Sequence, residues 1–116
     1  MIDEVRMDFK ITEYKRGTVV KGAGRIDSAS APDLEKIMMD LVQGGKSIIL
    51  DLQDVDFVSS AGWWSIIRVQ KELKKTSNQD LILASLCENV RDSMDLIGIL
   101  PYFGVYDNLV DAVASL

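Results

Sequence analysis

Histidine is absent from this sequence of 116 residues, and cysteine occurs only once, at Cys87. Without histidine the chain lacks the commonest general base, the usual partner of a nucleophilic serine and most zinc sites. A single cysteine allows no internal disulfide and no cysteine-built metal cluster. We expect Cys87 to be a buried, unreactive thiol. These absences favour a binding or regulatory module over an enzyme.

Long apolar runs and an excess of positive charge are also missing. No run approaches the roughly 20 apolar residues that a membrane-spanning helix needs, and the acidic N-terminus is unlike a secretory signal. The formal net charge of −5 disfavours binding to nucleic acids or anionic membranes. Hydrophobic residues make up 47% of the chain and charged residues 27%. We therefore expect a cytoplasmic protein with one domain, residues 1–116, and no direct membrane binding.

The order of the elements predicts an α/β fold. Residues 7–12 alternate apolar and polar side chains, with Met7, Phe9 and Ile11 on the inner face of a strand, and residues 18–26 complete a hairpin. Helices and buried strands then alternate to the end of the chain. We expect a mostly parallel central sheet of about five strands, with the antiparallel hairpin at its N-terminal end and about four flanking helices.

Three details of this pattern can be checked individually. Ser30 is expected to act as the N-cap of the first helix. Asp54 and Asp56 are expected to lie in turns that follow a short central strand at residues 47–52. Ile97 is expected to face the core from a helix at residues 88–98.

Residues 51–73 form the junction around which the rest of the chain is organised. A buried strand leads through a short loop to Ser59 and Ser60, and a helix follows at once. Binding sites in parallel sheets gather where strands pass into helices at their carboxyl ends. One serine hydroxyl can cap the helix, which is worth about 1 kcal/mol. Alternatively, Ser60 is phosphorylated at the positive end of the helix dipole; the two roles are compatible.

The helix after the serines has two different faces. Trp63, Ile66, Val69 and Leu73 fall on one side and are expected in the core. The opposite side carries Ser60, Trp64, Arg68, Lys71 and Lys75. A tryptophan among basic residues in an acidic protein is typical of an interface anchor. The alternative is that a neighbouring loop covers Trp64 and the basic residues are merely solvated.

The three aspartates before the serines could suggest a metal site or a hydrolytic carboxylate pair. Asp51, Asp54 and Asp56 do not match an EF-hand loop, because Val58 and a missing glycine break that pattern. A carboxylate pair would lack a supporting base or metal ligand. We therefore expect the three aspartates to be ordinary strand-end and turn residues, and we expect no metal site.

Three separated segments carry a family resemblance, which extends from about Lys10 to the C-terminus. Residues 24–35 read GRIDSASAPDLE, residues 48–67 read IILDLQDVDFVSSAGWWSII, and residues 96–113 read LIGILPYFGVYDNLVDAV. In this order and spacing they resemble a bacterial STAS domain of the anti-sigma factor antagonist type. The first segment resembles the family's Gly-x-Leu/Ile-Asp strand end, the second its phosphoacceptor segment and the third its closing loop and last helix.

The resemblance implies a partner-switching protein with no enzymatic activity and no cofactor. Unphosphorylated members bind an anti-sigma factor that is also a serine kinase with an ATP-binding domain; phosphorylation releases them and a serine phosphatase restores them. The acceptor position of the family's Asp-Ser-Ser/Thr-Gly motif falls on Ser60, within Ser59-Ser60-Ala61-Gly62. Asp27 matches the family's acidic residue near the acceptor. The partner-binding residues implied by the resemblance and the helix faces are Asp27, Ser59, Ser60, Ala61, Gly62, Trp64, Arg68 and Lys71.

The sequence also departs from the family pattern. The family's aspartate before the acceptor is Ser59 here, which removes a charge and offers a second acceptor, and Trp63 and Trp64 replace smaller residues. One alternative function is a non-phosphorylated STAS subunit that recognises the ATPase of a membrane transporter. The other is a small-molecule-binding or hydrolytic domain that uses the Asp-rich loop.

Overall fold

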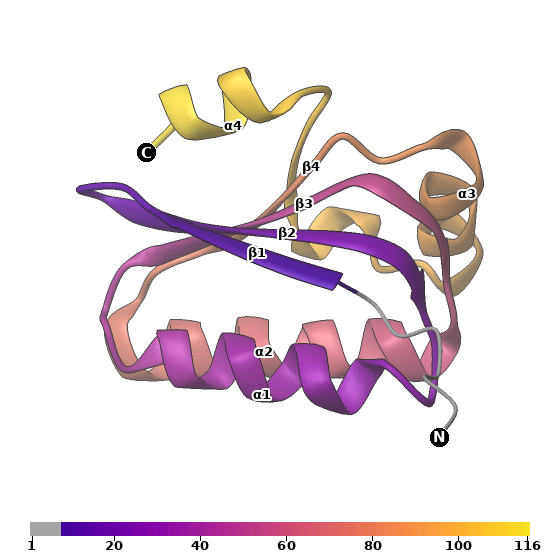
Figure 1. Cartoon of the computed structure of the whole chain (residues 1–116), viewed down its shortest axis with the longest axis horizontal. Helices are drawn as coiled ribbons and strands as arrows, with labels where there is room; N and C mark the ends of the chain where they lie inside the picture. The colour runs from indigo at the N-terminus through magenta and orange to yellow at the C-terminus, as the bar shows by residue number, and fades with distance from the viewer. Residues whose placement is uncertain (1–7) are drawn as a thin grey trace.

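A five-stranded sheet with the order β1-β2-β3-β4-β5 forms the centre of the computed structural model, which describes residues 8–116 (Figure 1). The strands are β1 Asp8–Glu13, β2 Gly17–Ile26, β3 Ser47–Val58, β4 Leu81–Ala84 and β5 Gly104–Tyr106. The helices are α1 Ala31–Val42, α2 Ser60–Ser77, α3 Glu88–Ile97 and α4 Leu109–Ala114, with a 3₁₀ turn, η1, at Leu100–Tyr102. Met7, placed in the first strand from the sequence, lies outside the described residues.

The predicted fold class is confirmed. β1 and β2 form an antiparallel hairpin, and the β2–β3, β3–β4 and β4–β5 pairs are parallel. Parallel neighbours need a crossover between them, and the intervening helical segments supply it. None of the helices within residues 8–116 is long and apolar enough to cross a membrane.

The helices cover the two faces of the sheet unequally. Figure 1 shows α1 and α2 side by side on one face and the short α4 on the other. The larger part of the core lies beneath the sheet, where Trp63, Ile66, Val69 and Leu73 of α2 are all buried as predicted. A smaller apolar cluster packs α4 against the opposite face through Ala112.

β3 is longer than the sequence predicted. The expected turns at Asp54 and Asp56 are strand instead, because β3 accommodates two extra residues opposite β2: Lys21 pairs with Asp51 but Ala23 pairs with Asp54, and a second shift follows. β4 pairs only with the stretch of β3 from Ile48 to Asp51. The end of β3 therefore extends past β4 toward the serines.

α3 supports this extension from the side that β4 leaves open. The Asn89 amide Nδ2 donates a hydrogen bond to the Asp56 carbonyl at 2.8 Å, and the Cys87 Sγ lies 3.6 Å from the Val55 carbonyl oxygen. Cys87 is only partly buried, at the N-terminus of α3, so the expectation of a buried thiol was wrong. Cys87 lies at this partly exposed place because its Sγ contacts the Val55 carbonyl near the end of β3.

Three other expectations need correction. Ser30 occupies the N-cap position of α1, but its backbone is helical rather than extended and its hydroxyl does not cap the helix. Ile97 is 36% exposed, because left-handed Gly98 turns the chain and Ile99 enters the core instead. Ile11 is 46% exposed, because it lies on β1, the edge strand of the sheet.

Candidate functional site

Ser59 joins the end of β3 to the start of α2. Its backbone N–H donates to the Ile26 carbonyl at 2.8 Å, which ties the end of β3 to the end of β2. The Ser59 backbone is extended, and its Oγ accepts a hydrogen bond from the Gly62 N–H at 3.1 Å. Ser59 is therefore the N-cap residue of α2, and the capping role predicted for one of the two serines is confirmed.

Ser60 is the first residue of α2 and its side chain is exposed. Its hydroxyl makes no hydrogen bond with any residue in the range 8–116. A group attached there would lie beside the free N–H groups and the positive dipole end of an 18-residue helix. Of the two serines, Ser60 has the accessible hydroxyl and Ser59 the engaged one.

Gly62 allows α2 to begin close to the end of β2. A Cβ at this position would lie 2.7 Å from Ile26 Cγ2, 2.9 Å from the Ile26 carbonyl oxygen and 3.0 Å from Val58 Cγ1. Two of these atoms belong to the residue that binds the Ser59 N–H. The glycine therefore fixes how closely the serine turn approaches the β2 end. Ala61, the residue before it, is exposed.

Asp27 follows Ile26 directly, so its turn lies next to the serine turn. Its Oδ1 accepts hydrogen bonds from the N–H groups of Ala29 at 3.0 Å and Ser30 at 3.2 Å. These two bonds, with Ala29 contributing most, hold the pKa of the Asp27 carboxyl below its ordinary value. The Ser30 hydroxyl donates to the Arg25 carbonyl at 2.6 Å and so closes this turn against the strand. The negative charge of the Asp27 carboxylate is therefore held in the turn next to the one that carries the accessible Ser60.

The outer face of α2 carries an exposed tryptophan. Trp64 is 53% exposed, and Lys71 and Lys75 are exposed further along the helix. Arg68 is also exposed, but its guanidinium makes two hydrogen bonds, of 2.9 and 2.7 Å, to the Glu35 carboxylate of α1. The Glu35 carboxylate balances the charge of Arg68. Of the three basic residues expected on this face, Lys71 and Lys75 therefore remain as positive charges that no carboxylate within residues 8–116 balances.

Trp64 lies between two hollows of the surface. One, of about 330 Å³, lies between the beginnings of α1 and α2 and includes Ala61 and Arg68. The other, of about 380 Å³, lies between α2 and the segment that links α3 to β5, and includes Lys71. Arg68 and Lys71 thus belong to different sides of Trp64.

The second hollow includes residues that sequence reasoning did not place at the site. Ile97 and Tyr102 line it, and Tyr102 is 70% exposed. The available signal was the concentration of apolar residues at 96–103, around a glycine and a proline. Their proximity to Trp64 depends on tertiary packing, so the pattern alone did not reveal it.

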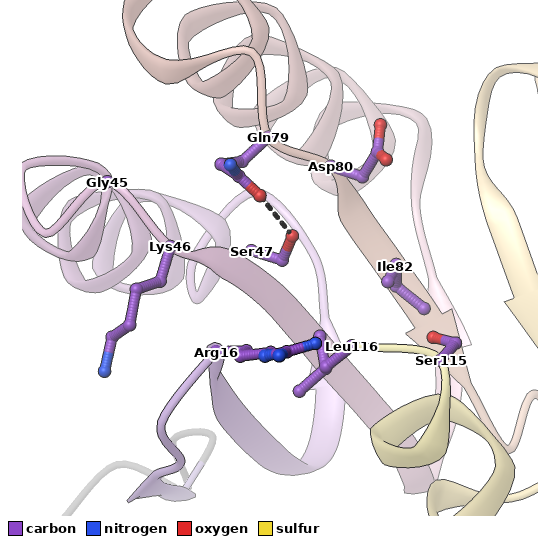
Figure 2. Close-up of a pocket in the computed structure, with 9 residues that line it drawn as sticks. All are labelled: Arg16, Gly45, Lys46, Ser47, Gln79, Asp80, Ile82, Ser115 and Leu116. Atoms are coloured by element: carbon purple, nitrogen blue, oxygen red, sulfur yellow. Dashed lines mark hydrogen bonds between the residues drawn. The ribbon is translucent and has the colours of Figure 1, made fainter.

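A larger hollow, of about 470 Å³, lies at the other end of the sheet. Figure 2 shows it between the residues that precede β3 and β4, with Arg16 lying across it beside Leu116. The Ser47 hydroxyl and the Gln79 Oε1 are 3.0 Å apart within it. Because this is the amino end of the parallel strands, the hollow is separate from the serines, which follow the carboxyl end of β3.

The three aspartates before the serines have separate surroundings. Asp51 is buried and its Oδ1 accepts from the Gln53 N–H at 3.1 Å, whereas exposed Asp54 pairs with Lys21 at 3.5 Å. Asp56 is exposed at the second irregularity of β3. Within residues 8–116, no group of three or more histidine, cysteine or carboxylate side chains is arranged to hold a metal ion.

Comparisons with known proteins identify the family of the chain. A family model for the STAS domain matches residues 8–112. BtrV of Bordetella bronchiseptica, a protein assigned as an anti-sigma factor antagonist, is 31% identical over 93 residues, which cover 79% of each protein.

Solved structures share the fold. An anti-sigma factor antagonist from Mycobacterium paratuberculosis has a TM-score of 0.84 at 24% identity, over 94% of this chain and 92% of that one. The Bacillus cell fate determinant SpoIIAA in its phosphorylated form has a TM-score of 0.71 at 17% identity, over 93% of this chain and 98% of that one. The chain therefore belongs to the STAS domain family of anti-sigma factor antagonists.

Proposed function

We propose that this chain is a partner-switching antagonist that binds an anti-sigma factor with serine-kinase activity and is released when Ser60 is phosphorylated. A serine phosphatase would then restore the binding form. The observation that carries the proposal is the exposed Ser60 hydroxyl, which makes no hydrogen bond to the described chain, at the start of α2. The relative BtrV is named as an anti-sigma factor antagonist, and SpoIIAA has been solved in a phosphorylated form.

Ser60 is the better acceptor of the two serines. The Ser59 hydroxyl already caps α2 through the Gly62 N–H, and Ser59 is half-buried. A kinase that modified Ser59 would have to disrupt this cap first. A phosphate on Ser60 instead meets the N–H groups at the beginning of α2, which favour an anion and leave the helix intact.

Phosphorylation would change the docking surface without unfolding it. A phosphoserine carries about −1.5 to −2 charges at neutral pH. The added charge would stand next to the turn of Asp27, whose carboxyl has a lowered pKa and is ionised at neutral pH. A partner that carries acidic side chains close to the neutral Ser60 hydroxyl would be repelled once the phosphate adds its charges beside the Asp27 carboxylate. This repulsion is the proposed switch.

The docking surface proposed for the unphosphorylated form is the exposed region around this junction. It comprises Asp27, Ser59, Ser60, Ala61, Gly62, Trp64, Arg68 and Lys71. Gly62 and Ser59 act by shaping the turn, since both have their contacts inside the chain. Trp64 is the central anchor, because it is the large apolar side chain most exposed on α2.

The test is to locate the phosphate after incubation with ATP and each purified serine kinase of the histidine-kinase-like ATPase class encoded in the source genome. Intact mass should increase by one phosphate with one of them. Ser60→Ala should abolish the modification, whereas Ser59→Ala should retain it. Ser28→Ala is a matched control, because Ser28 is a nearby exposed serine outside α2. Failure of every kinase to modify the chain, or modification that survives Ser60→Ala, would contradict the proposal.

A further inference from the structure

An apolar groove runs beside Trp64, between α2 and the segment that links α3 to β5. Its walls include Trp64 and Ile67 of α2, Ile97 of α3 and Tyr102 of η1, around a volume of about 380 Å³. Trp64, Ile97 and Tyr102 are 53%, 36% and 70% exposed. Exposed apolar side chains gathered around one groove mark an interaction site, whereas single ones do not. We call this hollow the Trp64 groove.

The walls of the Trp64 groove are held in place by polar contacts from α2. The Gln70 Nε2 donates to the Tyr102 carbonyl at 3.0 Å, and its Oε1 accepts from the Leu81 N–H at 2.8 Å. Deeper in the chain, the buried Trp63 indole donates to the Ser93 hydroxyl of α3 at 2.9 Å. Both η1 and α3 are thus fastened to α2, so a partner does not have to order the groove when it binds.

The charge at the rim indicates the chemistry of the occupant. Lys71 lines the groove and is exposed, and it forms no ion pair with any residue in the range 8–116. Arg68, by contrast, lines the other side of Trp64 and is already paired with Glu35. A segment lying in the Trp64 groove would therefore gain from a carboxylate directed toward Lys71.

We propose that the Trp64 groove receives an amphipathic helix of the kinase partner, with apolar side chains on one face and an acidic residue that pairs with Lys71. The proposal rests on the proposed function, which supplies the partner, and it extends the docking surface from the serine turn to α3 and η1. Trp64 connects the two parts, because it also lines the hollow beside Ala61. Helix-in-groove docking uses apolar anchors at i, i+3, i+4 and i+7.

The first test measures the affinity of the kinase that modifies Ser60 for unphosphorylated variants, by calorimetry. Tyr102→Ala should weaken binding about tenfold or more, and Lys71→Glu should weaken it by a similar factor that shrinks at high salt. Leu96→Ala is the matched control, because Leu96 is 89% exposed and does not line the groove; it should stay within about twofold. The exposed side chains of Tyr102 and Leu96 can be removed without opening the core.

The outcomes separate this inference from the proposed function. Equal binding of the wild type and Tyr102→Ala to a kinase that modifies Ser60 would overturn the groove and leave the switch standing. Self-association of the wild type in sedimentation that is lost in Tyr102→Ala would assign the groove to a second copy and also overturn the proposal.

A second test does not depend on the kinase. The whole ¹⁵N-labelled chain is titrated with a helical peptide that has leucines at i, i+3, i+4 and i+7 and flanking glutamates. The Trp64 indole and Gly98 amide signals should move, while the buried Trp63 indole should not. The same apolar peptide with flanking lysines should bind at least about tenfold more weakly. Unchanged Trp64 and Gly98 signals, or equal affinity of the two peptides, would overturn the groove even if no kinase modified Ser60.

Discussion

Ser59 and Ser60 are neighbours of the same chemistry, and the start of α2 falls between them. Ser59 has an extended backbone and uses its hydroxyl as a cap, whereas Ser60 is the first helical residue and exposes its own. The sequence indicated that at least one serine caps the helix. It could not say which, because sequence patterns place helix boundaries only to within one or two residues. The family resemblance implies that the acceptor is Ser60.

Ser59→Ala should destabilise the chain by about 1 kcal/mol, because the Gly62 N–H loses its acceptor. Urea denaturation at neutral pH measures this difference. Ser59→Asp should keep the free energy of unfolding close to that of the wild type, since aspartate caps helices as well as serine does. An alanine variant as stable as the wild type would show that the cap contributes nothing.

Gly62→Ala should lower the free energy of unfolding by more than the addition of one methyl group usually does. The added methyl group would lie 2.7 Å from Ile26 Cγ2 and 2.9 Å from the Ile26 carbonyl oxygen, so the start of α2 must shift. We expect a loss of about 1–3 kcal/mol in the free energy of unfolding, as for other overpacked sites. Gly104→Ala is the control: its methyl group would meet Ile82 and Tyr106 at 3.9 Å and should cost less. Similar losses for the two variants would refute the close-approach argument.

At the scale of elements, α1 and α2 are joined near the serine turn by the Glu35–Arg68 pair. Arg68 Nη2 lies 2.7 Å from Glu35 Oε1 and also donates to the Ser65 hydroxyl at 3.1 Å. The hydrogen bond from Arg68, followed by one from Ser65, lowers the pKa of the Glu35 carboxyl from its ordinary value of 4.5. The helix faces predicted the position of Arg68 but not this partner, because α1 and α2 are far apart in sequence.

The pH dependence of unfolding tests this pair. Because the folded pKa of Glu35 is depressed, its contribution is fully present above about pH 4.5 and is lost as the pH falls through the folded pKa. Glu35→Gln should therefore be less stable than the wild type at pH 7, and the difference should shrink in acid. Asp27, whose pKa is also lowered, is present in both proteins, so its contribution to the pH dependence cancels in the difference between them.

Glu72→Gln is the matched control for this comparison, since Glu72 forms no ion pair with the described part of the chain. Its free energy of unfolding at pH 7 should stay close to that of the wild type. A difference between Glu35→Gln and the wild type that stayed constant from pH 7 to pH 3 would mean that ionisation of Glu35 plays no part.

β3 and α3 mark the limit of what local pattern predicts. Asp54 and Asp56 have turn propensity, yet pairing with β2 keeps them in a strand with two extra residues. Contact with Asn89 at the start of α3 supports the same region. Tertiary pairing outweighed propensity here. The helix period of α2, by contrast, was correctly predicted, because this helix buries one continuous apolar face.

At the scale of the whole molecule, the two ends of the sheet have different surfaces. The carboxyl ends of β2 and β3 lead into the turns of Asp27 and Ser60, with Trp64 beyond them. The amino ends surround the hollow of about 470 Å³ that Figure 2 shows. The family and the fold class could be predicted from three segments of sequence. The groove at Tyr102 could not, because it depends on how α3 and η1 pack against α2.

Arg16→Glu should leave the proposed function unchanged. Arg16 lies in the hollow at the amino end, is exposed and forms no ion pair with a described residue, so reversing its charge should not affect the surface around Ser60. Phosphate incorporation and partner affinity should both stay within about twofold of the wild type, whereas Trp64→Ala should weaken binding about tenfold or more. A large loss in Arg16→Glu would place the docking surface at the opposite end of the sheet.

The most direct test of the proposed switch compares the affinity of one kinase partner for the chain before and after phosphorylation of Ser60. The phosphorylated form is purified, its single phosphate is assigned to Ser60 by fragment mass, and both forms are titrated calorimetrically. We predict that phosphorylation weakens binding by about a hundredfold or more, as like-charge contacts at an interface can, and that phosphatase treatment restores it. Equal affinity of the two forms, with the phosphate located on Ser60, would contradict the account.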